Sequence, residues 1–226
     1  MASANRTAIA AAVRIVGIVA LGCGAVSASW VASADAVHAE TGMSIPDANY
    51  ELGMYGDPES AARFWRQQHS SDCGEMAVAD VVGQITGREP TEQQITTVAE
   101  TAPSTASPGP IWTLSGNTDI RNLPALFWRY WIRAENIQTT MNALEQDLAD
   151  RRKVVVILNA ETIWNRPGRR DWANHFVVVT GIDTKAGVVH LNDSGINTGR
   201  DERVPIAAFE RAWAPNHNSA VVTRDR

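Results

Sequence analysis

Small and apolar side chains recur at helical spacing after a polar stretch in the first half of the chain. The stretch FWRQQHSSDCGEMAVADVV, residues 64–82, changes from polar to apolar at Cys73. This change predicts a helix from near Cys73 to about Ile85, which Gly87 ends. The cysteine is therefore expected at the junction of a loop and a helix.

Further helical patterns come before and after the predicted strands. The clearest is QTTMNALEQDLADRR, residues 138–152, with Met141, Leu144 and Leu148 at helical spacing. The others are PTEQQITTVAE at 90–100, TDIRNLPALFWRYW at 118–131 and VPIAAFERAW at 204–213. Residues 101–118 hold three prolines and several Ser, Thr and Gly, which predicts a long loop of the kind that is often functional.

β-branched runs in the last third of the chain predict the strands. They are KVVVILN at 153–159, NHFVVVTGID at 174–183, VVHLND at 188–193 and SAVVTR at 219–224. The turn TKAG between the second and third runs indicates an antiparallel hairpin. Because helices come first and the sheet second, the pattern favours an α+β fold with N-terminal helices packed on a C-terminal antiparallel sheet.

The N-terminus has the features of an export signal. Arg6 and Arg14 precede an apolar run from residue 15 to about 26, and Ala32-Ser33-Ala34 resembles a cleavage site. We expect residues 1–34 to be a signal peptide, 35–60 a linker or surface arm, and 61–226 the functional domain of a secreted or cell-envelope protein. The run is shorter than the about 20 residues that a membrane span needs, so no stable span is expected in the mature chain, although an uncleaved anchor stays open.

Composition excludes several classes of function. The net charge of −5 offers no electrostatic footprint for nucleic acid. The chain has no zinc-type Cys/His cluster and no glycine-rich phosphate loop, so we expect neither a metal nor a cofactor. The oligomeric state stays open.

The cysteine count makes Cys73 a candidate nucleophile. If cleavage follows Ala34, Cys23 leaves with the signal, and Cys73 has no intramolecular disulfide partner. A lone exported cysteine is paired between chains or is a free reactive thiol. A helix N-terminus and a nearby imidazolium both favour the nucleophilic thiolate.

His175 is the best candidate for the base among five histidines. It begins the strand that follows Asn174, where sheet hydrogen bonds would hold it facing a packed helix. The hairpin returns to Asp193, which can reach the far nitrogen of His175 and stabilise the imidazolium. Strand alternation places Asn192 on the other face, so Asp193 is preferred.

Two glutamines precede the cysteine. Gln67 lies six residues before Cys73, and Gln68 lies five before it. A side-chain amide together with the backbone N–H of the nucleophile would supply two donors to a developing oxyanion.

The whole pattern resembles the papain-like cysteine peptidases, most of all the bacteriocin-leader-processing (double-glycine) peptidase family and its secreted stand-alone relatives. The resemblance covers roughly residues 62–214. It implies a papain-like fold and a peptide or protein substrate, with Cys73 as nucleophile, His175 as base, Asp193 as orienter and Gln67 in the oxyanion hole. The family often has proline where this chain has Glu75 and Ser194, which leaves substrate preference open.

Three functions therefore compete. The favoured one is a secreted cysteine peptidase. The second is a cell-wall amidase or a transglutaminase-like acyl transferase that uses the same residues. The third is a non-catalytic binding module that keeps the fold, and it is the least favoured because all four candidate residues are present.

Overall fold

A computed structural model describes residues 53–225 of the chain. The helices are α2 (Pro58–Ala62), α3 (Cys73–Thr86), α4 (Glu92–Thr101), α5 (Leu123–Trp128), α6 (Met141–Ala149), α7 (Ala160–Ile163) and α8 (Ile206–Trp213), with 3-10 turns η1 (Ile120–Asn122) and η2 (Ala214–Asn216). The strands are β1 (Met54–Gly56), β2 (Arg133–Gln138), β3 (Val154–Leu158), β4 (His175–Asp183), β5 (Val188–Asn192), β6 (Glu202–Pro205) and β7 (Ser219–Arg224).

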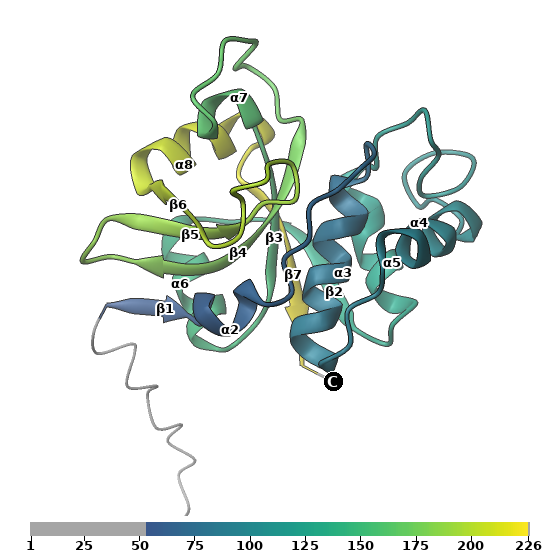
Figure 1. The fold of residues 1–226 in the computed structure, drawn as a ribbon, viewed down its shortest axis with the longest axis horizontal. Helices are drawn as coiled ribbons and strands as arrows, with labels where there is room; N and C mark the ends of the chain where they lie inside the picture. Colours follow the sequence, from purple (N-terminus) through teal and green to yellow (C-terminus); the bar gives the residue numbers. More distant parts are fainter. Residues whose placement is uncertain (1–52, 226) are drawn as a thin grey trace, which may run out of the picture. The chain divides into compact units, whose positions relative to one another are not determined.

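One antiparallel sheet organises this part of the chain. Its strand order is β2-β7-β3-β4-β5-β6, and β1 pairs with the far end of β4 (Figure 1). The central strands β3, β4 and β7 are buried on both faces, which explains why they read as unbroken valine-rich runs. The mixed helix and antiparallel-sheet fold confirms the α+β prediction.

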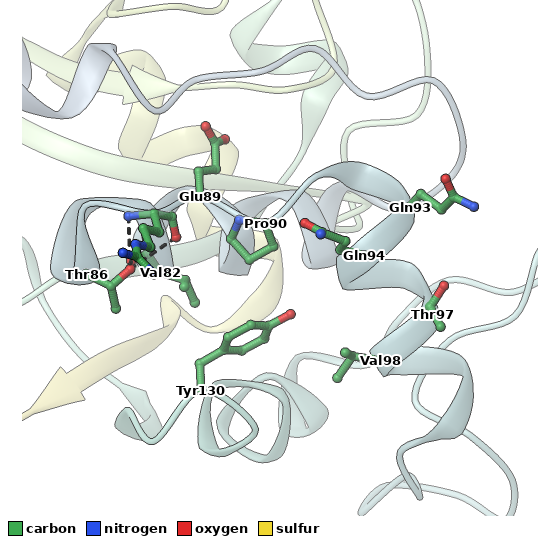
Figure 2. A pocket seen from close by; sticks show the side chains of 10 residues that line it. Val82, Thr86, Glu89, Pro90, Gln93, Gln94, Thr97, Val98 and Tyr130 are labelled. Atoms are coloured by element: carbon green, nitrogen blue, oxygen red, sulfur yellow. Dashed lines mark hydrogen bonds between the residues drawn. The ribbon is translucent and has the colours of Figure 1, made fainter.

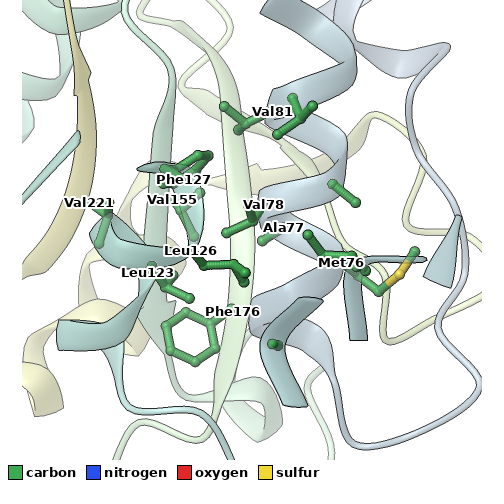
Figure 3. Close-up of a cluster of buried hydrophobic side chains, with 14 of the residues drawn as sticks. Met76, Ala77, Val78, Val81, Leu123, Leu126, Phe127, Val155, Phe176 and Val221 are labelled. Atoms are coloured by element: carbon green, nitrogen blue, oxygen red, sulfur yellow. The ribbon is translucent and has the colours of Figure 1, made fainter. Parts of the chain in front are cut away.

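Helices α3, α4 and α5 cover one face of the sheet. Phe176 and Val178 of β4 alternate with residues of the opposite face, and they pack with Val155 and Val221 against α3 and α5 (Figure 3). Helix α3 is buried over most of its length, because α4 and α5 flank it and β4 lies beneath it. This packing fixes the start of α3, where Cys73 lies, relative to the start of β4.

Helices α6 and α8 bury the other face. Val177, Val179 and Val222 point into this second core, where Phe209 and Trp213 of α8 are fully buried. The Trp213 indole N–H donates to the Ser219 carbonyl across 2.8 Å, so the largest side chain of this core has no unpaired polar group. No helix among residues 53–225 is long and apolar enough to cross a membrane.

Several short elements differ from the sequence predictions. Residues 54–56, placed in the expected linker, form β1 and pair with β4. The helix expected over 118–131 is shorter, because α5 ends at Trp128 and the chain then enters β2. Strand β2 has alternating polar residues at a sheet edge, so its sequence, RAENIQ, lacks the apolar run that identified the other strands.

The core between the sheet and helices α3 and α5, here called the first core, gives a direct test of this packing. Leu126 is fully buried between α3 and the sheet. We expect Leu126→Ala to lower the free energy of unfolding by about 2–5 kcal/mol, because it removes buried methyl groups and leaves a cavity. Leu114→Ala is the matched control, since Leu114 is 78% exposed, and it should change stability by less than about 0.5 kcal/mol. Urea denaturation followed by circular dichroism measures both; equal effects would contradict the assigned core.

Candidate active site

Cys73 is the first residue of α3, as the sequence predicts. It is a free, half-buried cysteine, and Asp72 precedes it as the N-cap residue. The unpaired N–H groups and the dipole at this helix end favour a negative charge on the sulfur. Gly74 lets the helix start approach the sheet closely, since a Cβ there would lie 3.3 Å from Cδ2 of Phe176.

His175 and Asp193 meet through the β4–β5 hairpin. His175 begins β4, Asp193 directly follows β5, and Nε2 of the ring lies 2.6 Å from Oδ1 of the carboxylate. The side chain of Cys73 also interacts with the ring and acts on its charge. Since Nε2 is used by Asp193, Nδ1 is the ring atom left to face the thiol. The structure thus brings together three of the four predicted site residues in the expected order.

The electrostatics of this cluster favour a charged imidazole. Burial alone would lower the pKa of His175, but the hydrogen bond and charge of Asp193, followed by those of Cys73, raise it to about 10. Burial would likewise raise the pKa of Asp193. Its bonds to His175, Trp164 and the Gly195 N–H outweigh that effect and hold the pKa below its usual range. The pair is therefore an imidazolium and a carboxylate at neutral pH.

Trp164 contacts both members of the pair. Its indole N–H donates to Oδ2 of Asp193 across 2.8 Å, and its ring lies over His175 with centroids 5.1 Å apart. Trp164 directly follows α7, whose first turn is capped by Asn159. No local pattern in the sequence reveals that this tryptophan reaches a residue 29 positions away.

Gly195 leaves space for the imidazole. A Cβ at this position would lie 2.8 Å from Cε1 of His175 and 2.9 Å from Cζ2 of Trp164. Its backbone N–H also donates to Oδ1 of Asp193 across 2.7 Å. Oδ1 thus accepts from both the imidazolium and the backbone, which satisfies a buried carboxylate.

The polar stretch before the cysteine lies along the loop that carries Asp193. The Trp65 indole N–H donates to the Asp193 carbonyl across 2.6 Å, and the Gln68 N–H donates to the Ser194 carbonyl across 2.9 Å. The side-chain amide of Gln68 is used as well: it donates to the Ser70 carbonyl and accepts from the Ser194 hydroxyl, each at 2.8 Å. Gln67 lies between these anchors with an exposed side chain.

Asn192 has a different role from Asp193. Its amide donates to Oδ2 of Asp80 across 2.7 Å and to the Ala61 carbonyl across 3.0 Å. Asp80 lies in α3, so this bond joins the helix that begins at Cys73 to the strand that Asp193 follows. These contacts agree with the prediction from strand alternation that Asn192 and Asp193 face different sides.

The loop predicted over residues 101–118 is hydrogen-bonded to the start of α3 at two points. The Trp112 indole N–H donates to the Ser71 carbonyl across 2.8 Å, and the Thr118 hydroxyl donates to Oε1 of Glu75 across 2.5 Å. Ile111 and Trp112 are buried in the first core. This loop therefore supports the end of the helix where Cys73 lies.

Two buried carboxyls, Asp72 and Glu75, and a half-buried one, Glu202, lie near the cluster and hold protons more tightly than usual. Burial raises the pKa of Asp72 to about 6 and those of Glu75 and Glu202 to about 7. A like charge adds to the shift in each case: Glu92 acts on Asp72, Asp72 on Glu75, and Asp193 on Glu202. Partial neutralisation of these carboxyls limits the negative charge that would oppose a thiolate at Cys73.

A large pocket of about 690 Å³ lies away from this cluster. Val82 and Thr86 near the end of α3 line it, together with residues of α4 and Tyr130. Figure 2 shows the Tyr130 ring pointing into it toward Gln94 and Val98. The rise of an α-helix places these α3 residues roughly 14 to 20 Å from Cys73, so the pocket is not part of the Cys73 site.

Comparisons with known proteins agree with the geometry. The model of the Peptidase_C39 like family matches residues 61–221. Uncharacterised proteins of Mycobacterium tuberculosis and Mycobacterium bovis are each 43% identical over 195 residues, covering 75% of this chain and 84% of the relative.

Two solved structures share the fold. One is described as a C39-like peptidase from Bacillus anthracis, with a TM-score of 0.58, 18% identity, and coverage of 76% of this chain and 98% of that one. The other is the peptidase domain of Streptococcus ComA, a bi-functional ABC transporter, with a TM-score of 0.52, 16% identity, and coverage of 72% and 98%. At these identities the likeness establishes the fold.

Trp164 offers a test of the cluster that does not depend on any substrate. Trp164→Phe keeps a ring over His175 but removes the donor to Asp193, and a hydrogen bond to a charged group contributes about 1.5–3 kcal/mol. We expect iodoacetamide to alkylate Cys73 roughly tenfold more slowly at neutral pH, because Asp193 loses a donor and no longer holds the His175 ring in a fixed position beside the thiol. Trp172→Phe, in the same loop but exposed, is the control and should react at the wild-type rate. Equal alkylation rates for the wild type and both variants would show that Trp164 does not act on the Cys73 site.

Proposed function

The chain belongs to the Peptidase_C39 like family, and from that premise we propose that it is a secreted cysteine peptidase acting through Cys73, His175 and Asp193. The observation that supports this most directly is the buried imidazole held between a carboxylate and a thiol. Thiolate and imidazolium together form the attacking group and the proton donor of a thiol hydrolase.

The cluster contains the parts needed for both halves of the reaction. The Cys73 thiolate attacks the scissile carbonyl carbon, and the resulting tetrahedral oxyanion collapses as the C–N bond breaks. The His175 imidazolium gives its proton to the leaving amine, which leaves a thioester on Cys73. Neutral His175 then takes a proton from water, whose oxygen attacks the thioester and releases the acid. Asp193 keeps its charge throughout and holds the ring in one orientation.

Gln67 is the proposed side-chain donor of the oxyanion hole. The amide of Gln68 is already bound to Ser70 and Ser194, whereas the exposed side chain of Gln67 is available to a substrate. Anchoring of Trp65 and Gln68 to residues 193–194 holds the backbone on both sides of Gln67. The backbone N–H of Cys73 at the helix start would supply the second donor.

Asp193 offers a test of the charge arrangement. Since Asp193 raises the pKa of His175, the imidazolium persists at neutral pH and is lost as pH rises toward about 10. Asp193→Asn removes that anion, so the alkaline limit of kcat/KM should move to lower pH, and kcat/KM at neutral pH should fall about tenfold or more. A peptide found by library profiling serves as substrate.

A second histidine–aspartate pair, with a buried histidine and a half-buried aspartate, supplies the matched control for that variant. Nδ1 of His190 in β5 lies 2.6 Å from Oδ1 of Asp201, which directly precedes β6. Asp201→Asn should leave the pH profile unchanged. If the two variants behave alike, the His175 pair has no special role.

If the protein cleaves only cell-wall amides, or transfers acyl groups to amines, the same residues act on a different substrate class.

Gln67 and Gln68 differ in their expected kinetic effects. Gln67→Ala removes a donor used in the transition state, so kcat should fall about a hundredfold or more while KM moves little. Cys73 of this variant should still be alkylated at the wild-type rate. Gln68→Ala instead loosens the contact with Ser194 and should act mainly on stability. A Gln68 variant that loses kcat with full stability would move the oxyanion donor by one residue.

Export is proposed from the N-terminal pattern alone, since residues 1–34 lie outside the described part of the chain. We expect the secreted protein to begin near Asp35. N-terminal sequencing of protein recovered from the medium checks this, and a cell-retained protein that begins at Met1 would contradict it.

A further inference from the structure

The turn that follows helix α5 has a tryptophan, Trp131, at the position where helix ends usually place glycine. The Trp131 N–H donates to the Trp128 carbonyl across 3.0 Å, and the Ile132 N–H donates to the Phe127 carbonyl across 3.2 Å. These two bonds form the pattern of a helix end that is closed by one left-handed residue just past the helix. That residue is Trp131, whose φ is 60°. A bulky side chain in this region is strained, so a benefit other than helix termination is needed to explain it.

The strained residue presents its ring to solvent. Trp131 is 75% exposed, and Trp128 beside it is 52% exposed. Their ring centroids are 5.7 Å apart, with the rings inclined at 63°. Single exposed apolar residues are ordinary, but two adjoining exposed tryptophans indicate a contact surface.

Two positively charged residues lie next to these tryptophans along the chain. Arg129 and Arg133 are exposed, and neither forms an ion pair within residues 53–225. The nearest acidic residue along β2, Glu135, is already bound to Arg224 at 3.0 Å. The cluster of Trp128, Arg129, Trp131 and Arg133, here called the α5 patch, is therefore positive in a chain with a net charge of −5.

We propose that the α5 patch docks the protein on an anionic phospholipid surface. Tryptophan rings favour the depth of lipid headgroups, where the ring is apolar and the N–H is wet. Arginines beside them complement lipid phosphates. The two rings are inclined rather than coplanar, so they do not form a flat platform for a sugar chain, whereas insertion among headgroups needs no coplanarity.

The patch lies at the opposite end of the α3–α5 layer from the Cys73 site. Leu123, the first residue of α5, lies beside Gly74. Tyr130, inside the patch sequence, lines the pocket beside Val82 and Thr86 near the end of α3 (Figure 2). Lipid docking through this end would leave Cys73 open to substrate, and the inference does not depend on the proposed peptidase activity.

Two variants remove the two components of the α5 patch. Trp131→Gly takes away the more exposed ring and suits the left-handed backbone, so folding should be preserved. Arg129→Gln with Arg133→Gln removes the charge and keeps both rings. Trp172→Ala is the matched control, because Trp172 is an exposed tryptophan beside an arginine in another loop.

The measurement is flotation of the full chain with vesicles of phosphatidylglycerol and phosphatidylcholine in equal parts, at low ionic strength. Brominated phosphatidylcholine in the same vesicles quenches tryptophans that reach the lipid. We expect Trp131→Gly to weaken partitioning about tenfold and to lose most of the quenching. The arginine variant should weaken partitioning about fivefold per charge, and Trp172→Ala should match wild type.

Quenching that is the same in wild type and Trp131→Gly would overturn the proposal, because any lipid contact would then come from another part of the chain. Absence of quenching in the wild type would overturn it as well. A dimer in the absence of lipid that Trp131→Gly converts to a monomer, without lipid quenching, would assign the patch to a second copy of the chain.

Discussion

The buried pair between Asp193 and His175 is the interaction on which the rest of the site depends. Removing two charges from water is costly, and a pair survives burial only when its remaining polar atoms are satisfied. Trp164 and the Gly195 N–H complete the bonds of the carboxylate, and Cys73 occupies the other side of the imidazole. The charge that this arrangement keeps on His175 is the charge that a thiolate needs beside it.

The surrounding fold fixes the start of α3, with Cys73, relative to the β4–β5 hairpin, with His175 and Asp193. Asn192 donates a hydrogen bond to Asp80 of α3, so the strand next to Asp193 is tied to the helix that begins at Cys73. Trp65 and Gln68 tie the polar lead-in to residues 193–194. Each contact joins segments more than a hundred residues apart, which is why the site requires the whole α3–β4–β5 assembly.

The sequence allowed prediction of those parts whose signals are local. The helix start at Cys73, the valine-rich strands and the hairpin turn are short-range patterns, and they place Cys73, His175 and Asp193 together. Strand β1 and the polar edge strand β2 are formed by pairing with β4 and β7, so their own sequences carry little signal. The contact of Trp164 with Asp193 could not be predicted either, because the two residues are 29 positions apart in the sequence. The role of Gln67 stays a prediction, as an oxyanion donor acts only when substrate is present.

The most direct test of the account is an NMR titration of His175 in the full chain, with specific ring labelling and a His175→Gln variant for assignment. The account predicts that the ring stays a charged imidazolium through pH 8, because the interactions with Asp193 and Cys73 outweigh the effect of burial and raise the pKa of His175 to about 10. Replacing Cys73 by Ser should lower that pKa. A His175 that loses its proton near the ordinary value of about 6.5 would contradict the central claim.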